Sequence, residues 1–165
     1  MAGDIKLQYG SPADFTITLG SLASSGTLVA GRESTVLDNT TNEFLDALVS
    51  GYIKAGTTPT AGNIEVWVYA QLDDTPTYPD VLDGTDSDET CTSRDVMFAG
   101  MKLAAKIVTT TTTDFVYPIA PFSVAALFGG VMPRRWGVFV THVMVAALNA
   151  SGHKLQYAPV HQQYT

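Results

Sequence analysis

The clearest hydrophobic pattern in the chain is a strict alternation over residues 63–72, NIEVWVYAQL. Successive side chains of a β-strand point to opposite faces, so this run predicts one strand with two distinct sides. One side is aliphatic throughout. The other side carries Trp67 and Tyr69 among polar residues, which is a large apolar area for a side that would face water. We therefore expect a second sheet, a loop or a neighbouring subunit to cover this aromatic pair.

Short runs of β-branched and aromatic residues recur elsewhere, separated by Gly, Asn, Asp, Ser and Pro, which predicts an antiparallel all-β domain. Strands are expected over residues 14–19, 33–38, 44–55, 63–72, 97–110, 114–120, 134–149 and 153–160. Periodicity alone also allows a helix over 44–55, but Gly51 favours a strand there. The alanine content of 97–110 makes a helix a rival in that segment as well.

Three local signals refine this pattern. Pro118 cannot donate a main-chain hydrogen bond, so the strand over 114–120 is expected at a sheet edge. Residues 121–130 predict one short helical turn that stops at Gly129-Gly130. The run 134–149 is apolar on both faces, which predicts a strand covered on both sides, joined as a hairpin to 153–160.

Together these elements give about eight strands, with no internal repeat and no helical half. We expect a single-domain antiparallel β-sandwich over residues 14–165, jelly-roll-like in its strand order. Residues 1–13 are rich in small and polar residues and predict a flexible N-terminal arm that orders on docking.

Composition points to a chain that associates with other subunits. Of its 165 residues 45% are hydrophobic and 15% are charged, against about 25% charged in typical soluble domains. The lone Cys91 excludes an intramolecular disulfide and a Cys-rich zinc site. No signal peptide and no run of about 18 apolar residues is recognisable, so we expect a cytosolically made protein without a membrane span.

Charge is unevenly distributed along the chain, which has a net charge of −7. Five basic residues follow residue 96 against one acid, Asp114, whereas residues 55–93 contain no Lys or Arg. This separation could orient contacts between copies or with a charged partner. It lacks the clustered Lys and Arg of a nucleic-acid-binding face, so no nucleic-acid partner is expected.

A long acidic loop over residues 73–95 is the clearest candidate for metal chemistry. Its candidate calcium ligands are Asp83, Asp86, Asp88 and Glu89, since calcium prefers several oxygens from a flexible loop. The spacing does not match an EF-hand loop, and a solvated acidic loop is the competing interpretation. No other cofactor is expected.

Enzyme motifs are missing from the sequence. There is no GxSxG elbow, GxGxxG, P-loop or HExxH pattern. Glu33, Glu43 and Glu65 could converge as hydrolase carboxylates, but their spacing does not support this. We expect a protein that is not an enzyme.

Two functions fit the exposed aromatic residues. Glu65 beside Trp67 resembles the floor of a sugar-binding groove, so a lectin-like, carbohydrate-binding module is one alternative. The favoured interpretation is a contact surface, because interfaces are enriched in Tyr and Trp and each buried aromatic contributes roughly 2–3 kcal/mol. The residues assigned to this surface are Trp67, Tyr69, Trp136, Arg134 and Arg135.

Two long stretches, residues 21–86 and 128–152, which include FGGVMPRRWGVFVTHVMVAALNASG, resemble small structural proteins that tailed bacteriophages and prophages encode near their head genes. The resemblance covers most of the chain and carries no catalytic motif. It implies a capsid-associated β-sandwich in the virion, made in the bacterial cytoplasm. A decoration or cement protein, commonly a homotrimer that clamps neighbouring major capsid protein subunits, is the first expectation. A head-fibre base or a neck or tail component is the alternative.

Overall fold

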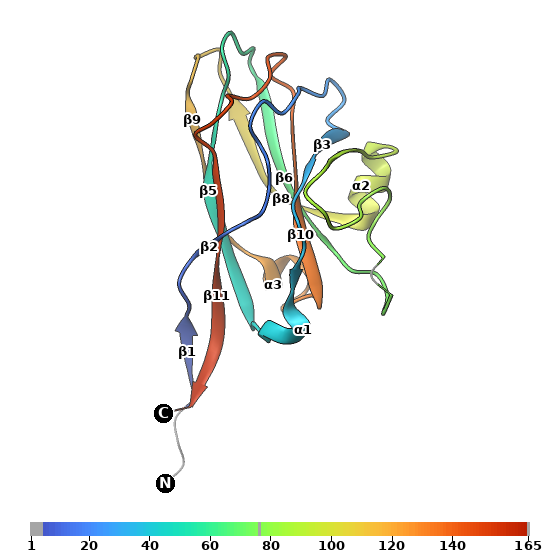
Figure 1. Ribbon diagram of the computed structural model, residues 1–165, viewed down its shortest axis with the longest axis vertical. Helices are drawn as coiled ribbons and strands as arrows, with labels where there is room; N and C mark the ends of the chain where they lie inside the picture. The colour runs from blue at the N-terminus through green and yellow to red at the C-terminus, as the bar shows by residue number, and fades with distance from the viewer. Residues whose placement is uncertain (1–4, 76, 165) are drawn as a thin grey trace.

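The computed structural model describes residues 5–75 and 77–164 and places two antiparallel sheets face to face (Figure 1). The first sheet runs in the order β1 (Ile5–Tyr9), β11 (Lys154–Tyr164), β5 (Asp46–Lys54) and β9 (Val116–Ser123), with β2 (Ala13–Asp14) also paired to β11. The second runs β7 (Asp88–Thr90), β3 (Ala30–Glu33), β10 (Arg135–His142), β6 (Gly62–Ala70) and β8 (Met101–Thr109), with β4 (Leu37–Asp38) paired to β10. The predicted all-β sandwich is confirmed, while its jelly-roll order stays a prediction.

The main core fills the space between the two sheets. The aliphatic side of β6 and one side of β10 face inward onto β5 and β9, as the alternation predicts. The buried residues of these four strands include Ile64, Val66, Val68, Val138, Val140, Val49, Ile53 and Ile119. The sandwich is therefore held by aliphatic burial across two sheets, the usual arrangement for inner faces that alternate with outer ones.

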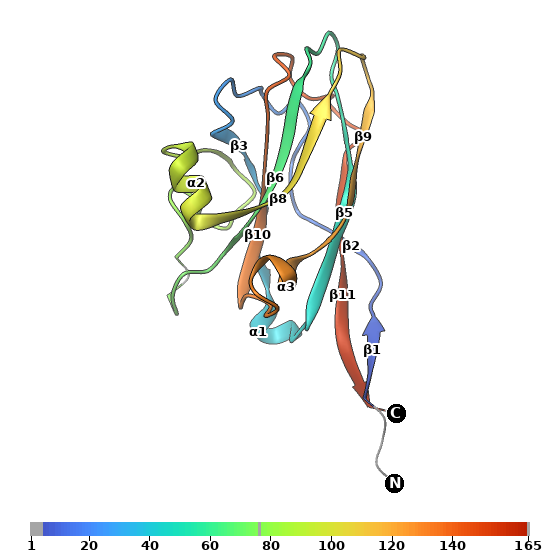
Figure 2. The ribbon, with the colours of Figure 1, turned by 180° about the vertical axis from the view of Figure 1, so that it is seen from behind.

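A third layer covers the outer face of the second sheet. The segment between β6 and β8, which contains β7 and the helix α2 (Arg94–Gly100), folds back over this face (Figure 2). Residues 136–142 of β10 are consequently all buried. The prediction that this strand is covered on both sides is confirmed for residues 136–142 of β10.

The predicted strands need correction in four places. The run 33–38 is interrupted, because β3 ends at Glu33 and β4 begins only at Leu37. Of residues 14–19, only Asp14 belongs to a strand, and the chain then leaves the ladder while Phe15 and Leu19 stay buried. The strand predicted over 134–149 ends at His142, and 143–149 is irregular. The hairpin to 153–160 is wrong because β10 and β11 belong to different sheets, and the connection between them crosses one end of the sandwich (Figure 1).

Both a helix and a strand, the two alternatives considered for residues 97–110, occur in this segment. Helix α2 begins after Ser93, whose side chain accepts a hydrogen bond from the Val96 amide, and β8 continues directly from Met101. A Ser at the N-cap favours the helix start, and the β-branched residues after Lys106 favour the strand. The helical turn predicted within 121–130 is confirmed as α3 (Val124–Leu127).

Helix α1 (Asn39–Asn42) follows β4 directly, and its N-cap Asp38 accepts a hydrogen bond from Thr40. Pro118 lies in β9, which is an edge strand of the first sheet, as predicted.

Beyond the sandwich, β1 and the end of β11 form a two-stranded ribbon that projects from one end of the molecule (Figure 1). Residues 5–9 pair in register with residues 160–164. The predicted N-terminal arm therefore contributes a strand. The predicted boundary between arm and domain, at residues 13 and 14, falls within β2, which pairs with β11. Residues 1–4 of that arm lie outside the described residues.

Candidate functional site

The aromatic pair that sequence analysis assigned to a contact surface is covered by the chain itself. Trp67 and Tyr69 have no exposed area. They form a second core with residues of the covering layer and of the adjoining strands, which are Tyr78, Leu82, Cys91, Met97, Met101 and Phe139. The assignment of Trp67 and Tyr69 to an interface is wrong, because the segment between β6 and β8 removes both rings from solvent.

Around Trp67, helix α2 supplies a charged and an aromatic contact. The guanidinium carbon of Arg94 lies 4.9 Å from the centre of the Trp67 ring, and the Phe98 ring meets the same indole edge to face at 4.9 Å. Arg94 Nη1 also donates to Glu65 Oε2 at 2.6 Å, and Trp67 Nε1 donates to the same oxygen at 3.1 Å. The buried carboxylate of Glu65 is thus paired and hydrogen-bonded, which is what a buried charge requires.

This arrangement removes the platform on which the carbohydrate-binding alternative depended. An indole face that stacks on a sugar must be open, whereas Trp67 lies beneath Arg94 and Phe98. Two of the three glutamates considered for a hydrolase are engaged within the fold, Glu65 with Arg94 and Glu33 with the acidic loop, and Glu43 caps the exposed end of α1.

Glu33 is the centre of a buried hydrogen-bond network that ties the acidic loop to the sheet. Its Oε2 accepts from the Tyr69 hydroxyl at 2.9 Å and the Gly84 amide at 3.2 Å. Its Oε1 accepts from the Asp83 amide at 3.1 Å and the Ser87 hydroxyl at 3.3 Å. Burial raises the pKa of Glu33, and the hydrogen bonds from Asp83, Tyr69 and Gly84 oppose this shift.

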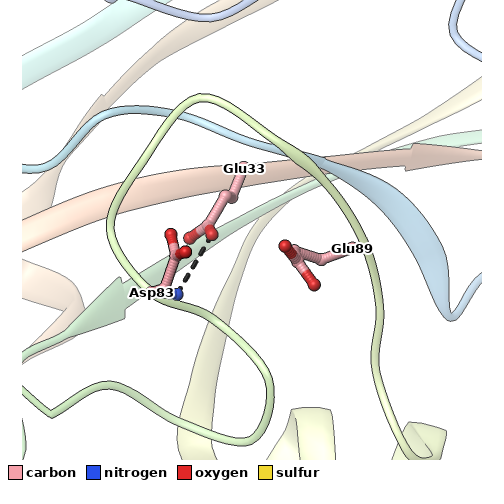
Figure 3. Close-up of side chains that lie close together, drawn as sticks. All are labelled: Glu33, Asp83 and Glu89. Atoms are coloured by element: carbon pink, nitrogen blue, oxygen red, sulfur yellow. Dashed lines mark hydrogen bonds between the residues drawn. The ribbon is translucent and has the colours of Figure 1, made fainter.

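The four candidate calcium ligands do not converge on one point. Asp86 and Asp88 both bind the Arg32 guanidinium, at 2.6 Å and 3.2 Å. Asp83 and Glu89 lie instead with Glu33, and one oxygen of each lies within 4.8 Å of the others (Figure 3). Because both oxygens of Glu33 already accept hydrogen bonds, this group is a satisfied acidic cluster, and calcium binding stays a prediction.

Of the remaining three residues assigned to the contact surface, one is buried and two reach the surface. Trp136 is fully buried and packs edge to face against Phe15 at 5.5 Å, so its assignment to an interface is also wrong. Arg135 binds Asp38 at 2.9 Å, and Arg134 pairs with Asp74. These two arginines reach the surface and hold neighbouring segments of the same chain, and their role between subunits stays a prediction.

Ion pairs in the folded chain join basic and acidic residues that lie far apart in the sequence. Basic residues of the C-terminal part bind acids of the N-terminal part, as in Lys154 with Asp14 and Lys106 with Glu65. Folding therefore brings the two unlike halves together.

The projecting ribbon carries a cluster of exposed apolar side chains. Ile5, Leu7 and Tyr9 are 58%, 64% and 65% exposed. They alternate with Lys6 and Gln8 along β1, so all three point to one face of the ribbon. A contiguous apolar face of this kind marks an interaction surface, and we take the ribbon as the candidate functional site.

Sequence reasoning missed this site although a signal was present. The run IKLQY alternates apolar and polar residues with period two, which is typical of a strand with one apolar face. Its five residues are few, and they lie in a segment that is otherwise small and polar. Pairing with a distant strand, β11, is what makes it a strand.

Comparison of the chain with protein-family models, with curated proteins and with solved structures finds no match. The longest helix in residues 5–75 and 77–164 is α2, with seven residues, and none there has the length and apolar character to cross a bilayer.

Proposed function

We propose that this chain is a structural protein of a tailed-phage virion, in the first place a capsid decoration or cement protein that oligomerises and clamps neighbouring capsid subunits. The sequence resemblance to small phage head proteins supports the virion assignment. The all-β sandwich with a projecting apolar ribbon supports an attachment role, since it combines a rigid body with a surface suited to binding another protein.

The observation that carries this proposal is the exposure of Ile5, Leu7 and Tyr9 on one face of the ribbon. Full burial of such side chains contributes roughly 1.5–3 kcal/mol each, and more than half of each is still exposed. Covering all three with a partner would therefore contribute on the order of 3–6 kcal/mol. A two-stranded ribbon is itself only marginally stable in water, so a partner would also stabilise it.

The position of the ribbon suits attachment. β1 and the end of β11 extend away from the two-sheet body, so their apolar face can reach a neighbouring surface without steric hindrance from the sandwich (Figure 1). In this proposal the partner is the major capsid protein, the location is the phage head, and the assembled decoration protein is a homotrimer.

Labelling of phage particles tests the proposal directly. Antibody raised against this chain, detected with gold particles, should label the heads of virions released from the bacteria that encode it. Label on the neck, the tail or the base of head fibres would instead support the alternative virion locations. Virions with no label, in cells where the chain is abundant in the soluble fraction, would contradict the proposal, and virions from a strain with the gene deleted are the control.

A further inference from the structure

One edge of β1 is unpaired. Among residues 5–75 and 77–164, this strand pairs with β11 alone. The Gly10 amide donates to the Pro159 carbonyl at 2.8 Å, which fixes the phase of the ladder. Because hydrogen bonding alternates along an antiparallel strand, Lys6 and Gln8 bond toward β11, and Ile5, Leu7 and Tyr9 turn their main-chain groups outward.

The other sheet edges have features that discourage pairing with a second chain. β9 contains two prolines, β8 carries two lysines, and β7, β2 and β4 have only two or three residues each. Prolines, short strands and charged side chains are common means by which proteins protect an edge. The β1 edge has no proline and a single charge, Lys6, so it is the edge best suited to accept a further strand.

We infer that β1 pairs with β1 of a second copy of this chain, antiparallel, about a two-fold axis at Leu7. In this register Ile5 lies opposite Tyr9 of the second copy, and all five residues overlap. The outward groups of residues 5, 7 and 9 then form up to about six main-chain hydrogen bonds. A two-fold axis makes the contact self-complementary, as closed dimers require.

The sequence of β1 favours this register over the two registers that differ from it by a shift of two residues. Centred on Leu7, the pairing places Lys6 opposite Gln8 of the second copy, so no like charges face each other. A slip of two residues in one direction centres the axis on Lys6, where two lysines oppose each other and destabilise the pair. The slip in the other direction centres it on Gln8 and leaves Ile5 without a cross-strand partner.

The expected dimer is weak. Five residues from each strand bury far less than the roughly 1,200 Å² of a stable interface. The pairing would nevertheless convert a two-stranded ribbon into a four-stranded sheet, which is more stable. This inference deepens the proposed virion role by naming a two-fold contact between copies in solution, distinct from the three-fold contacts of the homotrimer proposed on the capsid. Because it is tested in solution without capsids, its failure and the failure of the virion proposal are distinguishable.

Analytical ultracentrifugation across a concentration series tests the contact. The wild type should show a reversible monomer–dimer equilibrium. Leu7→Pro should raise the dissociation constant at least about tenfold, because it removes an outward donor and leaves the bonds to β11 intact. Leu7→Ala keeps that donor, so its dissociation constant should lie between those of the wild type and Leu7→Pro. A wild type that sediments as a monomer at every concentration, or Leu7→Pro that associates like the wild type, would overturn the inference.

Cysteine crosslinking tests the register. Across the two-fold axis the Leu7 Cα atoms would lie about 5.5 Å apart, within disulfide range, whereas the Ile5 Cα atoms would lie roughly 14 Å apart. Under mild oxidation Leu7→Cys should form a covalent dimer at least about tenfold faster than Ile5→Cys. Equal rates for the two variants would contradict this register. The native Cys91 is buried and does not compete.

Discussion

The guanidinium carbon of Arg94 lies 4.9 Å from the centre of the Trp67 ring. This contact joins the first turn of α2 to the outer face of β6, and it explains why a strand with two apolar sides occurs in this chain. Both sides are internal, because one faces the other sheet and the other faces the covering layer. A cluster of exposed apolar side chains lies elsewhere, on the ribbon.

Trp67 is expected to be essential for folding. Trp67→Ala should lower the free energy of unfolding by about 3–5 kcal/mol, because it removes a fully buried indole and leaves a cavity beneath α2. Phe98→Ala is the matched control, since Phe98 is 56% exposed and should change stability much less. Urea unfolding followed by circular dichroism measures both. A Trp67→Ala variant with wild-type stability would contradict the covered position of this ring.

Glu33 should make stability depend on pH. Glu33→Gln is expected to lower the free energy of unfolding by about 1–3 kcal/mol at pH 7, because an amide group would face the donors that now bind a carboxylate. Since burial raises the pKa of Glu33 in the native state, its titration stabilises the fold below the ordinary value of 4.5. That contribution is lost as the pH rises through the raised pKa.

The difference in unfolding free energy between wild type and Glu33→Gln should therefore be largest below about pH 4.5 and smaller at pH 7.5. Urea titrations at several pH values measure it. Glu89→Gln is the control and should stay within about 0.5 kcal/mol of wild type. A difference that grows with pH would show that the native pKa of Glu33 is lowered, contrary to the structure.

Cys91 reports on the integrity of the covering layer. Burial, together with the charges of Asp80 and Glu89, raises the pKa of this thiol from 9.0 to about 11. Two pKa units correspond to about a hundredfold less thiolate near pH 8, and steric burial slows access further. Native protein should therefore react with a disulfide reagent at least about a hundredfold more slowly than protein in urea. Rapid, complete labelling of the native state would contradict a closed layer.

Two strands of the second sheet, β6 and β10, were predictable from local pattern. The alternation in residues 63–72 identified β6, and the doubly apolar run from residue 134 identified β10 as covered on both sides. These signals are strong because inner and outer positions differ in hydrophobicity residue by residue. The edge position of β9 followed in the same way from Pro118, which lacks a donor.

What covers β6 was not predictable, because the covering segment has no regular period. Tyr78, Leu82 and Cys91 are irregularly spaced among acids and turn residues, a pattern typical of a solvated loop. Their burial depends on tertiary contacts, above all on Glu33 accepting hydrogen bonds from the loop. The ribbon shows the reverse case, in which a short alternation was too brief to stand out from a polar segment.

The most direct test of the ribbon as the attachment surface is binding of purified protein to phage particles made without it. Wild type is compared with an Ile5→Ser, Tyr9→Ser double variant, which removes apolar area from the ribbon and keeps every main-chain donor. A Val108→Ser, Val131→Ser double variant is the control, since both valines are more than 70% exposed outside the ribbon. Co-sedimentation should show at least about tenfold weaker binding for the ribbon variant and wild-type binding for the control. Equal binding of wild type and ribbon variant, or no binding of the wild type, would contradict the account.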